Sequence, residues 1–192
     1  MKKREFLAAG GGLGLVNIAS AATPARNGPT LLTLSGAIGA GNRGALDPAL
    51  DQMMVKHKVR FDRAHTFDFD ALTALPSIAI RPTLEYDGKP HALRGPLLVD
   101  VLRAAGAATG AQGRMLLRAI DGYAVPLTLA LARQYGFIVA THLDGKPMGV
   151  GGLGPLWAVY EADAHADMAA KPLGERFALC PWGLYHVEVL KD

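Results

Sequence analysis

Short apolar runs and runs of alternating apolar and polar residues follow one another along most of the chain, separated by segments rich in Gly, Pro, Asn and Asp. Runs of this kind are typical of β-strands. We predict strands over residues 31–36, 77–86, 115–120, 123–125, 137–141, 156–160 and 182–190. The Asp-Gly pairs at 87–88, 121–122 and 144–145 predict tight turns between neighbouring strands.

Other segments have the end signals of short helices. We predict helices over residues 47–54, 67–76, 95–106 and 128–134. Asp68 and Thr128 stand at N-cap positions, and Pro96 and Gly106 begin and end the segment with the clearest helical stripe of apolar residues. Many short strands combined with a few short helices predict a β-rich α+β fold, with a single domain over residues 30–190.

Composition narrows the class of protein. The chain has 192 residues, of which 50% are hydrophobic, and its net charge is +3, which fits one folded domain with a core of its own. The basic run 56–63 suits either an edge strand or a solvated face, and the sequence leaves both open. Because no Lys/Arg stripe is present, nucleic acid is a poor choice of partner.

The first residues have the pattern of an export signal. Lys2, Lys3 and Arg4 precede a Gly-rich apolar stretch, and the segment 19–21 (Ala-Ser-Ala) resembles a cleavage site. Residues 3–7 (KREFL) resemble a twin-arginine signal with Lys at the first Arg position. We therefore expect residues 1–21 to be a signal peptide and the product to be periplasmic. The alternative is an N-terminal helix of the domain, for which the glycines are unfavourable.

Several segments, in their order and spacing, resemble the sulfite-oxidase-type molybdopterin-binding fold in its small, single-domain form. They are LTLSGAIG, FDFDALTALP, LRGPLLVDVLRAAGA, AIDGYAVPL, YGFIVATHLDGKPM and GPLWAVY, followed by a Trp and an alternating strand near the end. The resemblance covers residues 30–189. It implies a mixed, β-rich fold built around a pterin-type cofactor.

In molybdenum members of that family, a cysteine near the end of the strand after the FD…LP helix ligates the metal. The corresponding residues 80–87 contain no cysteine, and the only cysteine, Cys180, lies elsewhere. Together with Trp157 in GPLW, this departure is similar to a metal-free branch that includes periplasmic pterin-binding regulators. Those proteins act on a membrane-bound enzyme that makes or degrades cyclic di-GMP. The resemblance therefore implies a non-catalytic pterin-binding regulator without molybdenum.

A reduced pterin (tetrahydropterin type) presents two neighbouring N–H donors, which one carboxylate can accept together. Asp121 is the first candidate for this role, and Glu85 is the second. Asp121 equally suits a structural role, because Asp-Gly pairs are common in tight turns.

The ring faces and remaining polar atoms of a pterin require aromatic or cationic partners. Trp157 is the candidate for stacking, Tyr123 for a hydrogen bond through its hydroxyl, and Arg81 and Arg94 for a ring carbonyl. Each has a structural alternative: Trp157 as a core residue, Tyr123 as a half-buried tyrosine, and the arginines as surface charges. Trp182 is expected to be a core residue.

Motifs for other chemistry are absent from the sequence. The six histidines do not have the spacing of a metal site, and neither GxSxG nor a Walker-type loop occurs. Two alternatives to the regulator remain at this point. One is a small molybdopterin-dependent oxidoreductase with a non-cysteine ligand, and the other is a protein–protein module whose pocket is filled by its own side chains.

Overall fold

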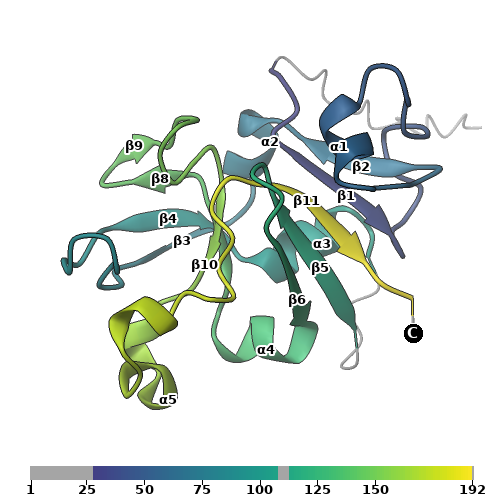
Figure 1. The fold of residues 1–192 in the computed structure, drawn as a ribbon. Helices are drawn as coiled ribbons and strands as arrows, with labels where there is room; N and C mark the ends of the chain where they lie inside the picture. The colour runs from purple at the N-terminus through teal and green to yellow at the C-terminus, as the bar shows by residue number, and fades with distance from the viewer. Residues whose placement is uncertain (1–27, 108–112, 192) are drawn as a thin grey trace, which may run out of the picture.

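The computed structural model describes residues 28–107 and 113–191, so the predicted signal peptide over residues 1–21 lies outside the described part. Figure 1 shows a β-rich arrangement in which short helices lie around three groups of strands. The prediction of a β-rich mixture of strands and short helices agrees with this arrangement.

The largest sheet has five strands in the order β2-β1-β11-β5-β6. Its strands are β1 (Leu32–Gly36), β2 (Ala64–Phe67), β5 (Arg114–Ala119), β6 (Ala124–Thr128) and β11 (Leu184–Val189). The pair β1 and β11 is parallel, whereas the other neighbours are antiparallel. The parallel pair therefore places the carboxyl ends of β1 and β11 together at one edge of the molecule (Figure 1).

Two smaller sheets complete the strand layer. One has the order β3-β4-β8-β9 and the other pairs β7 with β10. Their strands are β3 (Ser77–Ile80), β4 (Leu93–Pro96), β8 (His142–Leu143), β9 (Lys146–Pro147), β7 (Ile138–Ala140) and β10 (Trp157–Val159). All residues of β7 and β10 are buried, so these two strands lie in the middle of the core.

The helices are short, and two begin as the sequence predicts. They are α1 (Gln52–Lys56), α2 (Phe69–Thr73), α3 (Leu98–Ala104), α4 (Leu129–Gln134) and α5 (Ala166–Ala169), with 3₁₀ turns at Ala162–Ala164 and Leu173–Glu175. Asp68 accepts a hydrogen bond from the Ala71 amide at 2.8 Å, and the Thr128 hydroxyl accepts one from the Leu131 amide at 3.1 Å. Local capping chemistry thus sets the starts of α2 and α4.

Other predicted boundaries are wrong. Gly95 and Pro96, predicted to open a helix, belong to β4, and α3 begins at Leu98. The strand predicted over 77–86 ends at Ile80, and Glu85 lies in a turn. The basic run 56–63, for which the sequence left an edge strand and a solvated face open, forms the end of α1 and a loop. For Gly95 and Pro96, pairing with the distant strand β3 decides the structure.

One hydrophobic core connects all three sheets. The side chains of Leu32, Leu117, Trp157 and Val187 are almost fully buried in it. Among the described residues, no helix is both long enough and apolar enough to cross a membrane.

Candidate functional site

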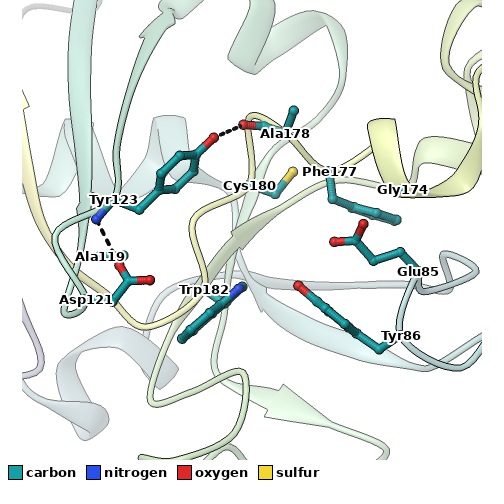
Figure 2. A pocket seen from close by; sticks show the side chains of 10 residues that line it. All are labelled: Glu85, Tyr86, Ala119, Asp121, Tyr123, Gly174, Phe177, Ala178, Cys180 and Trp182. Carbon is teal, nitrogen blue, oxygen red and sulfur yellow. Dashed lines mark hydrogen bonds between the residues drawn. The ribbon is translucent and has the colours of Figure 1, made fainter.

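A cavity of about 240 Å³ lies where three segments meet: the turn after β3, the β5–β6 turn, and the stretch leading into β11. We call it the Trp182 pocket. Figure 2 shows the side chains that line it: Glu85, Tyr86, Ala119, Asp121, Tyr123, Gly174, Phe177, Ala178, Cys180 and Trp182. Its volume is small beside the roughly 300–1,000 Å³ of drug-sized ligand sites, so it suits one small ring system.

Asp121 and Tyr123 reach the pocket from the β5–β6 turn. The Asp121 Oδ1 atom accepts a hydrogen bond from the Tyr123 amide at 2.9 Å, so Asp121 does perform the structural role of a turn residue. Among the described residues, no donor bonds to Oδ2, which leaves that oxygen to a ligand. The Tyr123 hydroxyl donates to the Ala178 carbonyl at 2.8 Å. Tyr123 therefore anchors the wall at Ala178, and its O–H is not free to donate to a ligand.

Glu85 and Tyr86 form the wall opposite Asp121 (Figure 2). Burial, together with the Glu85 carboxylate, raises the pKa of Tyr86 to about 12. Tyr86 is therefore a neutral hydroxyl at physiological pH. Figure 2 shows its ring directed toward Trp182, with Asp121 on one side of Trp182 and Glu85 on the other.

Trp157, the candidate for ring stacking, does not line the pocket and is a core residue, which was its structural alternative. Its side chain is 1% exposed, and its indole Nε1 donates to the Cys180 carbonyl at 2.9 Å. Its ring centroid lies 5.9 Å from that of Phe177. Trp157 therefore supports the pocket wall from within the core.

Trp182, predicted from the sequence to be a core residue, is half-buried and lines the pocket. It forms an isolated antiparallel bridge with Trp157. The next residue, Gly183, has a φ of +63° and precedes the first residue of β11. Trp182 thus lies outside the regular alternation of β11. The glycine that follows Trp182 is the feature of the sequence that could have placed it outside the strand.

Cys180 also lines the pocket, although nothing in the sequence predicts a place for it there. It is a free, buried cysteine, and burial raises the pKa of its thiol well above the ordinary value. A protonated thiol is a poor nucleophile and a poor metal ligand.

The two arginine candidates lie outside the pocket. Arg81 is exposed directly after β3, and Arg94 is exposed on β4. The positive charge of Arg94 contributes to lowering the pKa of His142, after the larger effect of burial. The ten residues around the pocket include two carboxylates and no Lys, Arg or His.

The histidines have structural surroundings. His91 bonds to Asp144 at 2.7 Å and to Asp87 at 3.0 Å, and these carboxylates raise the pKa of His91. This cluster joins the turn after β3 to the β8–β9 turn. Within the described part of the chain, no three His, Cys, Asp or Glu side chains are grouped so that they could hold a metal ion.

No protein-family model and no curated protein sequence matches the chain. Among solved structures, it is similar to the sulfane dehydrogenase SoxCD from Paracoccus pantotrophus, with a TM-score of 0.53 and 11% sequence identity. The match covers 84% of this chain but only 38% of the SoxCD chain. The sulfite-oxidase-type resemblance is thus supported as a distant likeness of fold.

Proposed function

We propose that the protein binds a small, flat heterocycle of the reduced-pterin type in the Trp182 pocket and performs no chemistry on it. The observation that carries this proposal is the lining of the pocket: Glu85 and Asp121 on either side of the Trp182 indole, without a basic residue. Two carboxylates select N–H donors, and an indole face offers a stacking surface.

Asp121 and Glu85 have different parts in this proposal. The free Oδ2 of Asp121 accepts from one edge of the ring system, while Oδ1 keeps the β5–β6 turn in place through the Tyr123 amide. Glu85 accepts from a donor on the opposite edge. Tyr86 stays neutral, and its hydroxyl interacts with Glu85 and Trp182, so it adds no charge to the pocket.

The same lining does not fit molybdopterin, the cofactor that the fold resemblance suggests. Molybdopterin carries a phosphate, and two carboxylates without a cation repel an anion. The oxidoreductase alternative requires a metal ligand other than cysteine, and the Cys180 thiol in the pocket does not supply one, because its raised pKa works against metal ligation. Metal analysis of protein from a host with an active molybdenum pathway separates the two functions. Stoichiometric molybdenum would establish the alternative and contradict the pterin proposal.

The pterin proposal is tested by titrating the purified protein with reduced and oxidised pterins. Tryptophan fluorescence reports binding in the wild type, and calorimetry reports it in the variants. We expect saturable binding, and an affinity lower by about tenfold or more in Asp121→Asn and in Glu85→Gln, because each removes one charged acceptor. Asp70→Asn is the matched control, since Asp70 is exposed on α2 and is not among the residues that line the pocket.

Absence of saturable binding by any pterin would overturn the proposal. Unchanged affinity in Asp121→Asn would remove only the role of that carboxylate. Trp182→Phe is expected to abolish most of the fluorescence change, whereas Trp157 lies behind the pocket wall and serves as an internal reference.

We further propose that the protein is exported to the periplasm and regulates a membrane-bound cyclic di-GMP cyclase or phosphodiesterase. The support is the sequence resemblance to pterin-binding regulators and the export-like residues 1–21. In this scheme the pterin acts through a difference in partner affinity between the free and bound states. Capture of such an enzyme with equal strength in the presence and absence of pterin would contradict the proposed regulation. Retention of residues 1–21 in the protein isolated from cells would contradict the proposed export.

A further inference from the structure

A second hollow, of about 230 Å³, has the opposite charge. It is lined by Gly36, Arg60, Phe61, Asp62, Arg63 and Lys191, and we call it the Arg60 pocket. It lies where the parallel strands β1 and β11 end, because Gly36 is in register with Val189 and the Ala37 amide donates to the Val189 carbonyl at 2.8 Å. The fold thus brings residues from three separate parts of the chain to one place.

Within residues 28–107 and 113–191, the cations of this pocket have no carboxylate partner, in contrast to two neighbouring cations. Arg43 is paired with Asp51, and Arg118 with Glu188. Among the described residues, no carboxylate lies within ion-pair distance of Arg60, Arg63 or Lys191. Three cations therefore face one hollow.

The described residues that line the hollow carry a net positive charge. Among the described residues that line the hollow, Asp62 is the one acid beside three cations, so positive charge is in excess among them. Arg63 uses one guanidinium nitrogen to donate to the Ile38 carbonyl at 3.3 Å, which fixes the side chain but does not neutralise it.

The loop that carries the arginines is held in place. The Phe61 ring is half-buried, the Arg43 guanidinium carbon lies 5.2 Å from its centroid, and the His186 ring is stacked on it with the two centroids 6.4 Å apart. The Leu46 amide also donates to the Phe61 carbonyl at 3.1 Å. Because Phe61 anchors the loop, Arg60 and Arg63 are kept together even though their charges repel each other.

We propose that the Arg60 pocket binds a tetrahedral oxyanion, namely a phosphate or sulfate group. Guanidinium groups match the oxygens of such an anion through paired N–H donors, and a lysine adds a point charge. The small volume suits one such group. This site is separate from the Trp182 pocket, whose charged lining residues are two carboxylates, and it does not depend on pterin binding.

The proposal is tested by NMR titration of the full-length chain with inorganic phosphate, with sulfate and with glycerol 3-phosphate, each against sodium chloride at equal ionic strength. We expect saturable shifts of the Gly36, Phe61 and Asp62 amides with the oxyanions and not with chloride. Tighter binding of glycerol 3-phosphate than of inorganic phosphate would identify an organic phosphate monoester as the preferred source of the group.

Arg60→Gln and Lys191→Gln are each expected to weaken phosphate binding by about tenfold, because each removes a charge-assisted contact. Lys146→Gln is the matched control, since Lys146 is an exposed cation on β9. All three side chains are exposed, so the folded state is retained, and circular dichroism checks this. Shifts that equal those in chloride, or an unchanged affinity in both pocket variants, would overturn the proposal.

Discussion

His186 is a fully buried histidine whose hydrogen bonds determine which ring nitrogen carries the proton. Its Nε2 atom lies 2.9 Å from the Ser35 hydroxyl, and its Nδ1 atom lies 3.1 Å from an Arg118 guanidinium nitrogen. Because Arg118 can only donate, Nδ1 accepts and Nε2–H donates to Ser35. His186 therefore has the tautomer opposite to that of the base that activates a serine nucleophile. The Ser35–His186 hydrogen bond has a structural role.

Acid is expected to destabilise the protein through His186. Burial, and then the charge of Arg118, lower the pKa of His186 to about 3 in the folded state, below the value of about 6.5 in an unfolded chain. The neutral ring therefore contributes stability above about pH 6.5, and this contribution is lost as the pH falls toward the folded pKa, with a slope of up to about 1.4 kcal/mol per pH unit.

Urea unfolding of the wild type and of His186→Gln between pH 7 and pH 4 measures this contribution. Glutamine keeps a donor for Ser35 but does not titrate. The free energy of unfolding of the variant should depend less on pH in this range, whereas identical pH dependence in the two proteins would contradict the assignment.

At the scale of elements, β4 shows why local signals misplace some boundaries. Gly95 and Pro96 precede an apolar helical stripe, so the sequence predicts that they open the helix. In the structure Gly95 pairs with Ile78 of β3, and Pro96 pairs with Ser77. The caps Asp68 and Thr128 were predicted correctly, because their partners lie three residues away. Pairing across more than fifteen residues leaves no comparable trace in one sequence.

Gly95 is expected to be irreplaceable in β4. A Cβ atom at this position would lie 1.9 Å from the Val139 carbonyl oxygen of β7, and backbone cannot withdraw from such a contact at low cost. Gly95→Ala should lower the free energy of unfolding by at least about 4 kcal/mol or prevent folding. Gly44→Ala is the matched control, because a Cβ there meets no atom within 4 Å. Similar urea midpoints for the two variants would show that β4 and β7 separate easily.

At the scale of the whole molecule, the candidate site is assembled from distant segments. Asp121 and Tyr123 were found from the sequence, because the Asp-Gly turn between two strands is a local signal. Glu85 was also predicted as a site residue, but it was expected in a strand and lies in a turn. The roles predicted for Trp157 and Trp182 were interchanged. Each follows a proline within two residues, and only the packing of β10 inside the core distinguishes the buried Trp157 from the half-buried Trp182. Burial of this kind depends on the three-dimensional fold.

The walls of the Trp182 pocket come from the turn after β3, the β5–β6 turn and the segment before β11. A ligand bound in this pocket should therefore stabilise the entire domain. A ligand that binds only the folded state at a concentration of 100 times its Kd contributes about 2.7 kcal/mol. For a domain of this size, that corresponds to a rise in Tm of about 5–10 °C.

Thermal unfolding followed by circular dichroism, with and without a reduced pterin, measures this shift. Far-UV and near-UV signals should move together, since one core connects the three sheets. The shift should shrink in Asp121→Asn and Glu85→Gln and remain in Asp70→Asn. A pterin that binds by calorimetry but raises Tm equally in all four proteins would place its site outside the Trp182 pocket, while the Arg60 pocket and its phosphate response would stay unaffected.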